Sequence, residues 1–399
     1  FHNDAILRAF EREMGRDVIR PDIAGLMGAY GAALCAMRLK KSAILSPEDL
    51  AKFSHTSRPA VCNGCENRCK LTVNTFADGA RFVSGNRCER GAGGKKDAEE
   101  LPNLYKYKRE TLLQMGGGEA RRGRIGLPLA LGMYELLPLW SGIFRALGFE
   151  VVLSGMSDRA TYEAGQFTIP SDTACYPAKI MHGHVARLLE KGVDAVFYPC
   201  LTQNFDEGDT DNHFNCPVVA YYSELLRGNM PELTDENFLY PHLNICDEKG
   251  LAAELGKALS KRFGRICARE MRAAVKKGMA DYQAYMAGVR QKGEEALIWA
   301  RSYKKRIMVL AERPYHIDAE IGHGIDQLAT SLDFAVVSED SVYHLARTPE
   351  VHVLNQWTYH ARLYRAAAFV ATQPDVSSCS SSPSAAAWTP SPPTRSAAS

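Results

Sequence analysis

Four closely spaced cysteines are the strongest chemical signal in the sequence. Cys62, Cys65 and Cys69 have the spacing C-x2-C-x3-C, and Cys88 follows 19 positions later. A C-x2-C turn directs two thiolates toward one ion, and a distant cysteine completes a tetrahedral set. The spacing predicts a four-cysteine metal-binding unit over residues 62–90, and it leaves zinc and an iron–sulfur cluster equally open. The alternative without metal is a reduced, cysteine-rich loop.

The segment between Cys69 and Cys88 is expected to bring these cysteines together. LTVNTFADGARFVSG alternates apolar and polar residues around Asp78-Gly79, which predicts a β-hairpin that turns at this pair. The hairpin would return Cys88 to the other three cysteines. A unit this small has no visible core, so a metal is the expected source of its stability.

Two further cysteines, Cys175 and Cys200, border a predicted helix and a predicted strand. Cys175 comes just before a helix expected from about 177 to 191, and Cys200 ends the predicted strand DAVFYPC. A helix N-terminus favours a thiolate, and open α/β sheets bind ligands at the carboxyl ends of their strands. The two positions predict part of a metal or iron–sulfur site. The alternative is a pair of buried, unreactive cysteines.

Other polar residues are weaker candidates. One cluster follows a predicted strand end, where a cleft residue would lie, and each member has a structural role as its alternative: Arg313, His316, Asp318 and His323. His182 and His184 have i, i+2 spacing, which places them on different helix faces and argues against joint ligation. The remaining cysteines considered have no partner spacing and no predicted role: Cys35, Cys216, Cys246 and Cys267.

From Arg124 onward the sequence alternates between strand and helix patterns. The expected strands are RIGLP, FEVVLS, DAVFYP, PVVAYYS (217–223), RIMVLAE (306–312) and FAVVSED (334–340). The expected helices lie at about 133–147, 177–191, 247–304 and 324–332. Such β-α-β alternation predicts parallel sheets with right-handed crossovers. The predicted fold class is α/β, with two Rossmann-like parallel-sheet lobes over residues 123–371 and a helical segment between them.

The flanking regions are expected to be simpler. Residues 1–40 read as two helices, too short for a domain of their own, and residues 41–61 as a linker. Residues 91–122 are predicted to be a polar linker, because GAGG and GGG do not match the phosphate-binding loop pattern. Residues 372–399 are low in complexity and are not expected to form a core.

The composition excludes several functions. The 48 Lys and Arg residues nearly balance the 46 Asp and Glu residues, for a net charge of +2, so nucleic acid is not an expected partner. No run of 18 apolar residues predicts a membrane helix. Eleven cysteines without secretory features indicate metal or redox use in the reducing cytoplasm.

Two stretches resemble activators of 2-hydroxyacyl-CoA dehydratases. FHNDAILRAFEREMGRDVIRPDIAGLMGAYGAAL is similar to the final segment of their actin-like ATPase domain. Residues 124–371 resemble the dehydratase-subunit-like domain that follows the ATPase repeats in large, fused activators. The matching stretches are RIGLPLALGMYELLPLW, IPSDTACYPAKIMHGHV, VDAVFYPC, AERPYHIDAEIGHGI and NQWTYHARLYRAA.

The resemblance implies a fragment of an ATP-dependent activator that passes low-potential electrons to a dehydratase. Cys175 and Cys200 match two of the three cysteines that hold a cluster, of the 4Fe-4S type, in dehydratase subunits. The nucleotide-binding loops belong to the upstream ATPase domain of the same polypeptide, so this chain alone is not expected to bind ATP. The implied partner is a dehydratase-type protein. Two alternatives are a non-catalytic scaffold with a structural zinc site and, less favoured, a lyase that acts on an acyl-CoA.

The tail carries one further expectation. With suitably chosen codons, residues 382–396 read in another frame contain a Gly-Cys-Gly turn, which resembles the third cluster cysteine of the family. This predicts a frameshift within residues 372–399. Cys379 lies in a Ser-rich segment, and we expect nothing to fix its position as a substitute ligand.

Overall fold

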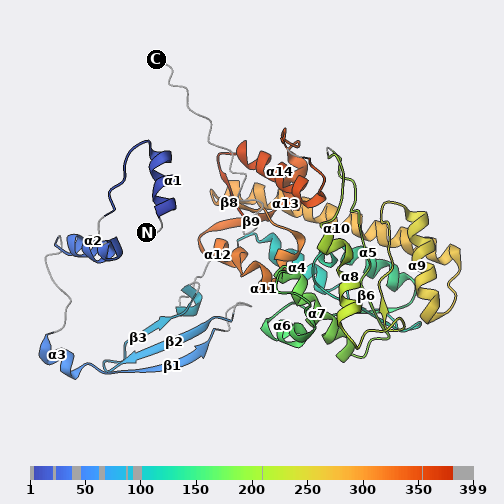
Figure 1. The fold of residues 1–399 in the computed structure, drawn as a ribbon, viewed down its shortest axis with the longest axis horizontal. Helices are drawn as coiled ribbons and strands as arrows, with labels where there is room; N and C mark the ends of the chain where they lie inside the picture. The colour runs from blue at the N-terminus through green and yellow to red at the C-terminus, as the bar shows by residue number, and fades with distance from the viewer. Residues whose placement is uncertain are drawn as a thin grey trace, which may run out of the picture. The chain divides into compact units, whose positions relative to one another are not determined.

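The structure is a computed structural model that describes residues 4–20, 24–37, 46–62, 68–86, 89–92, 101–208, 210–352 and 354–380. The chain divides into two compact units, one of residues 1–58 and 73–82, and one of residues 59–72 and 83–399. Figure 1 labels most of the helices and several strands of both units.

The first unit begins with exposed helices. They are α1 (Asp4–Met14), α2 (Met27–Ala36) and α3 (Pro47–Lys52), and none of their described side chains is buried. The first two fit the helices expected in residues 1–40. Residues 41–61, expected as a linker, differ from the expectation because they contain α3 and strand β1 (His55–Val61). The Ser46 side chain caps α3 by accepting a hydrogen bond from the Asp49 backbone at 3.1 Å.

The predicted hairpin is present. Strands β1, β2 (Lys70–Phe76) and β3 (Arg81–Ser84) follow one another in a three-stranded sheet. The turn between β2 and β3 lies at Asp78-Gly79, where Gly79 has a φ of +83° that suits glycine. The Phe76 backbone donates to the Ala80 carbonyl at 2.9 Å and so closes the turn.

The second unit contains two parallel-sheet lobes, as the strand and helix alternation predicted. Lobe 1 has the sheet order β5-β4-β6-β7, and every pairing is parallel. Its strands are β4 (Arg124–Leu127), β5 (Glu150–Leu153), β6 (Ala195–Phe197) and β7 (Phe238–Leu239). Its connecting helices are α5 (Met133–Ala146), α6 (Arg159–Gly165), α7 (Tyr176–Glu190) and α8 (Pro217–Asn229). Trp140 of α5 packs edge-on against Phe197 of β6, with ring centroids 5.0 Å apart, and both are fully buried.

The strand expected at 217–223 is wrong, because these residues begin α8. Pro217 occupies the first helical turn, where its missing N–H costs nothing. Val219, Tyr222 and Leu226 are buried and recur at helical spacing. A short apolar run of this kind fits either a strand or a buried helix, so the spacing of its apolar residues could not distinguish the two.

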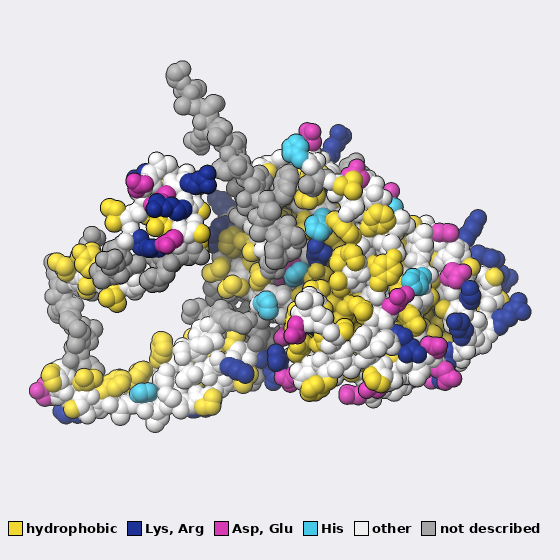
Figure 2. All heavy atoms as spheres, viewed as in Figure 1, with side chains coloured by type: hydrophobic (Ala, Val, Ile, Leu, Met, Phe, Trp, Pro, Cys, Tyr) yellow, Lys and Arg dark blue, Asp and Glu magenta, His cyan; other side chains and the backbone are white. Residues whose placement is uncertain are grey.

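The helical segment between the lobes is confirmed, with one break. It consists of α9 (Glu248–Phe263) and the long α10 (Ala268–Ser302), separated at Gly264, whose φ is +76°. Lys and Arg side chains gather over α9 (Figure 2). Helix α10 runs against α5, and a side chain at Gly278 would lie 2.5 Å from the Leu139 carbonyl. No helix in the described ranges has the length and apolar character to span a membrane.

Lobe 2 has a smaller sheet of order β10-β8-β9, again with parallel pairings. Its strands are β8 (Arg306–Leu310), β9 (Phe334–Ser338) and β10 (Val376–Cys379). Its helices are α11 (Ala319–Gly322), α12 (Ile325–Ser331), α13 (Glu339–Val342) and α14 (Thr358–Ala371), with 3-10 turns at Pro314–Ile317 and Tyr343–Leu345.

Strand β10 corrects one expectation about the tail. Cys379 has a defined position, because it pairs with Leu310 of β8 and its carbonyl accepts a hydrogen bond from the Ala311 backbone at 2.9 Å. The sheet pairing of Val376–Cys379 was hidden by the Ser-rich composition. Residues 381–399, including the codons read in another frame, lie outside the described residues.

The linker expected at 91–122 is also corrected, because it contains the buried helix α4 (Leu104–Leu113). Leu104, Tyr105 and Leu112 are buried, and α4 packs against α5 and β9. Two cations on the same helix, Lys108 and Arg109, are buried as well and form ion pairs with lobe 2. Their charges gave the segment its polar, linker-like composition.

Candidate functional site

The four-cysteine unit is described in part. The Cys62 backbone donates to the Cys69 carbonyl at 2.9 Å, and Cys69 is buried. This bond joins the backbone at the two ends of the C-x2-C-x3-C segment. Cys65 and Cys88 lie outside the described residues, so the convergence of all four sulfurs stays a prediction.

Cys175 lies where the sequence placed it, immediately before α7. Pro177 occupies the first turn of that helix, and the Cys175 side chain is exposed. Desolvation by the surrounding side chains raises the pKa of the Cys175 thiol, while the Ala178 backbone N–H in the first turn opposes that effect. The amide therefore favours the thiolate, as expected at a helix N-terminus.

Cys200 lies just beyond the carboxyl end of β6 and is buried. Its sulfur is 2.9 Å from the Ser223 hydroxyl of α8, and its backbone forms an isolated parallel bridge with His242. Burial raises the pKa of the Cys200 thiol, and the Ser223 hydrogen bond opposes the rise. This is the edge of a parallel sheet at which ligands bind.

Tyr198 is a buried tyrosine two residues before Cys200. It is 3% exposed, and its hydroxyl has no hydrogen-bond partner among the described residues. Burial raises the pKa of Tyr198, and the charges of Cys200, Cys216 and Cys175 raise it further. Part of the rise in the pKa of Tyr198 thus comes from the charges of these thiols. Cys216 has no partner cysteine at a regular spacing, so the sequence predicted no role for it.

Of the polar cluster after β8, Arg313 lies next to this site. Its positive charge partly opposes the rise in the pKa of Cys175, and its guanidinium is 3.2 Å from the His360 ring. Asp318 instead joins the lobes, because its buried carboxylate accepts hydrogen bonds from the Tyr134 hydroxyl at 2.6 Å and the Ser157 backbone at 2.8 Å.

The two histidines of that cluster differ from each other. Burial lowers the pKa of His316 to about 4, and its Nδ1 accepts a hydrogen bond from the Arg313 backbone at 3.1 Å. His323 is exposed, with a φ of +51°. Neither observation places a histidine next to the cysteines.

His182 and His184 point to different neighbours, as their spacing indicated. The His182 ring nitrogens lie 2.7 Å from the Thr168 hydroxyl and 3.1 Å from the Tyr222 hydroxyl. The His184 ring nitrogens each lie 2.8 Å from a serine hydroxyl, of Ser154 and Ser157. Both rings use both nitrogens within the protein, so they serve packing rather than joint ligation.

A second group around Cys200 has metal-ligand chemistry that the sequence did not reveal. The ligand atoms of Cys200, Glu224 and His242 all lie within 4.8 Å of one another. Glu224 and His242 are exposed and already hydrogen-bonded to each other at 2.8 Å. Cys200 is therefore a candidate ligand together with this pair, as well as the predicted partner of Cys175.

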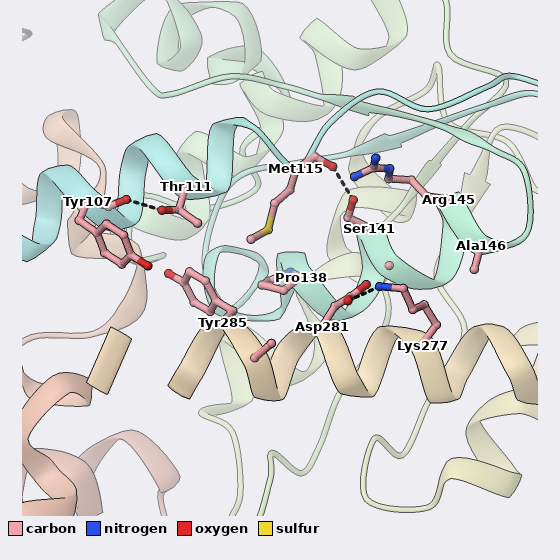
Figure 3. A pocket seen from close by; sticks show the side chains of 12 residues that line it. Tyr107, Thr111, Met115, Pro138, Ser141, Arg145, Ala146, Lys277, Asp281 and Tyr285 are labelled. Carbon is pink, nitrogen blue, oxygen red and sulfur yellow. Dashed lines mark hydrogen bonds and ion pairs between the residues drawn. The ribbon is translucent and has the colours of Figure 1, made fainter. Parts of the chain in front are cut away.

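A pocket of about 570 Å³ lies between α4, α5 and α10 (Figure 3). Its lining includes Tyr107, Met115, Ser141, Lys277 and Asp281. Lys277 and Asp281 form an ion pair with each other, and the Ser141 hydroxyl donates to the Met115 carbonyl. None of the predicted site cysteines lines this pocket.

The residues around Tyr198 fit an iron–sulfur cluster chemically. Thiolates are the usual ligands of such clusters, and Cys175 and Cys200 supply two of them. The free hydroxyl of Tyr198 is a buried donor of the kind that hydrogen-bonds cluster or thiolate sulfur.

Comparison with known proteins shows that one family model matches the chain. Residues 124–342 match the family model described as "CoA enzyme activase uncharacterised domain", which is more than half of the 399 residues. The match includes Cys175, Cys200 and Tyr198, and it excludes the four-cysteine unit and strand β10. No curated protein and no solved structure gives a match.

Proposed function

The chain belongs to the CoA enzyme activase domain family, and from this we propose that it is part of an ATP-dependent activator of 2-hydroxyacyl-CoA dehydratases. In this proposal the lobes carry an iron–sulfur cluster, of the 4Fe-4S type, for low-potential electron transfer to a dehydratase-type protein. ATP hydrolysis belongs to an ATPase domain upstream in the same polypeptide. The likeness of residues 1–40 to the end of such a domain supports this division of labour.

The observation that supports the proposal is that Cys175 immediately precedes α7 and Cys200 follows the carboxyl end of β6, in the same parallel-sheet lobe. A bound cluster would supply one-electron redox chemistry. The residues of this chain would hold and tune it: Cys175 and Cys200 through their sulfurs, and Tyr198 by hydrogen bonding to sulfur. Burial of Cys200 and Tyr198 restricts solvent, which affects the reduction potential.

The four-cysteine unit suggests a second metal within the same activator. We assign Cys62, Cys65, Cys69 and Cys88 as its ligands, with zinc and iron–sulfur both compatible with four thiolates. The alternative function, a scaffold or docking subunit, would have zinc at this unit and no cluster between the lobes.

Metal analysis after anaerobic purification tests the proposal. We expect the chain to bind about four iron and four sulfide at the lobe site. The double variant Cys175→Ala/Cys200→Ala should lose that amount, and Cys35→Ala, at an exposed cysteine of α2, should lose none. Zinc without iron or sulfide in the parent chain would favour the scaffold function and refute the activator.

A further inference from the structure

Cys200 and His242 lie side by side at the carboxyl edge of the lobe 1 sheet. Strands β6 and β7 are parallel neighbours, and each of the two residues lies three positions past the end of its strand. They form an isolated parallel bridge that continues the register of the sheet. The Cys200 backbone donates to the Pro241 carbonyl at 3.0 Å, and the Leu243 backbone donates to the Cys200 carbonyl at 3.0 Å. Residues opposite each other in such a pairing present their side chains to the same face.

Helix α8 places Glu224 beside this pair. The Ala220 carbonyl of α8 accepts a hydrogen bond from the backbone of the residue after Cys200 at 3.1 Å. The Ser223 hydroxyl, about one helical turn later, is 2.9 Å from the Cys200 sulfur. Both contacts hold the same stretch of α8 against the chain after β6. Glu224 follows directly, and its carboxylate is 2.8 Å from the His242 ring.

The three side chains have the closeness expected of ligands to one ion. The Cys200 sulfur, a Glu224 carboxylate oxygen and a His242 ring nitrogen all lie within 4.8 Å of one another. Atoms bound to one zinc ion at about 2.0–2.3 Å lie roughly 3–4 Å apart. Burial fixes Cys200, whereas the side chains of Glu224 and His242 are 53% and 60% exposed and are free to rotate toward an ion.

A second exposed histidine–glutamate pair shows what is specific to this place. His344 and Glu294 also lie 2.8 Å apart. Among the residues that the structure describes, Cys200, Glu224 and His242 form the one group of three with this closeness, so the pair in lobe 2 has no third ligand of this kind. The nearby sulfur therefore distinguishes the lobe 1 pair from an ordinary surface hydrogen bond.

We propose that Cys200, Glu224 and His242 form a site for a single zinc ion. Thiolate, imidazole and carboxylate are the ligand types that zinc takes in proteins, and a thiolate disfavours magnesium and calcium. Three protein ligands leave a fourth position, which the exposure of Glu224 and His242 opens to water. The Cys200 thiol releases its proton to solvent as its sulfur binds zinc, and the Ser223 hydroxyl then donates to the thiolate.

This zinc site goes beyond the proposed function and does not depend on it. A sulfur bound to zinc is not available to a cluster iron, so zinc would occupy the chain that has no cluster at Cys200. Zinc binding is therefore measured in the metal-free chain, and cluster binding is measured separately after reconstitution with iron and sulfide.

Chemical modification of histidines tests the site in the full chain. Diethyl pyrocarbonate acylates a free imidazole nitrogen, and peptide mass spectrometry quantifies each histidine. We expect free zinc at about ten times its dissociation constant to slow the modification of His242 about tenfold, because about a tenth of the chains then have a free ring. His344, also exposed and also paired with a glutamate, should react at the same rate with and without zinc. Zinc at the four-cysteine unit does not affect this readout.

Two substitutions show whether the sulfur and the carboxylate take part. We expect Cys200→Ser and Glu224→Gln each to abolish the protection of His242 at the same zinc concentration. Cys246→Ser, at an exposed cysteine outside the group, should leave the protection unchanged. Because Glu224 is exposed, Glu224→Gln is a surface change with little effect on folding, and the test does not depend on the buried Cys200 alone.

The outcomes separate this inference from the proposed function. Protection of His242 that persists in Cys200→Ser would reduce the site to an exposed pair and overturn the inference, as would equal modification of His242 with and without zinc. Either result would leave the activator proposal standing, because that proposal depends on iron and sulfide uptake. Protection that both substitutions abolish, in a chain that takes up neither iron nor sulfide, would support the zinc site and refute the activator.

Discussion

Lys108 and Asp340 form an ion pair of 2.6 Å that is closed off from solvent, with their side chains 4% and 2% exposed. Lys108 comes from α4, ahead of lobe 1, and Asp340 from α13 in lobe 2. Burial alone would raise the pKa of Asp340, but the Lys108 ammonium holds it below its ordinary value. The adjacent Glu339 is also buried, and burial followed by the charge of Asp340 raises its pKa well above the ordinary value. The pair therefore ties α4 to lobe 2.

Removing Lys108 should destabilise the protein strongly. Lys108→Met leaves the Asp340 charge buried without its partner, and breaking a buried pair costs about 3–5 kcal/mol. Lys106→Met is the matched control, because Lys106 lies on the same helix and makes an exposed, 4.0 Å pair with Glu110 worth less than about 1 kcal/mol. Urea unfolding measures both. Equal free energies of unfolding for the two variants would show that the buried pair contributes nothing.

Helix α4 also shows where sequence reasoning is limited. The alternation from Arg124 to Ser338 predicted the two sheets, because buried parallel strands are apolar runs and are recognised by composition. Lys108 and Arg109 are buried only because Asp340 and Asp326 neutralise them. A pairing across more than 200 residues leaves no local pattern, so the segment was taken as a linker.

Some residues of the cysteine site could be predicted from the sequence, and others could not. Cys175 and Cys200 were found because a helix start and a strand end are visible in the sequence. Ser223 and Glu224, which lie beside Cys200, were missed because they belong to α8, and the first part of that helix was taken as a strand. Asn215, whose side-chain amide donates to the Leu201 carbonyl just after Cys200, has no sequence signature of that role.

Gly183 makes close packing of α6 and α7 possible, so Gly183→Ala should be destabilising. An added Cβ would lie 1.6 Å from the Thr161 carbonyl oxygen, a backbone atom that cannot move without shifting α6. We expect a loss of at least the ~1–3 kcal/mol typical of overpacking, measured by thermal unfolding. Gly228→Ala is the control, since Gly228 lies in α8 with nothing within 4 Å of an added Cβ. That change should stabilise by up to about 1 kcal/mol. Similar effects of the two substitutions would contradict the packing argument.

His182 should make the protein sensitive to mild acid. Burial lowers its pKa from 6.5 to about 4, so the folded state keeps the ring neutral while the unfolded chain takes up a proton below pH 6.5. Stability is then lost as the pH falls from 6.5 toward 4, by no more than about 3 kcal/mol from this residue. His182→Gln should reduce the difference in free energy of unfolding between pH 8 and pH 5. His323→Gln, at an exposed position, serves as the control. An unchanged difference in His182→Gln would argue against a buried neutral ring.

The four-cysteine unit yields the last prediction. The 2.9 Å bond between the Cys62 backbone and the Cys69 carbonyl closes one loop, and the turn at Asp78-Gly79 reverses the chain toward Cys88. If the four sulfurs share one zinc ion, each lies about 2.3 Å from it and about 4 Å from the others. X-ray absorption at the zinc edge should then detect four sulfurs. A chain that binds iron here instead should show no zinc and additional iron and sulfide.

Single substitutions decide whether the four cysteines act together. Cys69→Ser and Cys88→Ser should each remove the metal of this unit, because three thiolates leave a structural site incomplete. The hairpin should also become more accessible to protease, since a unit without a core depends on its metal for stability. Cys35→Ser, at an exposed cysteine that precedes the unit, should change neither measurement. Full metal content in Cys88→Ser would place Cys88 outside the site and leave only the three cysteines of the C-x2-C-x3-C segment as protein ligands.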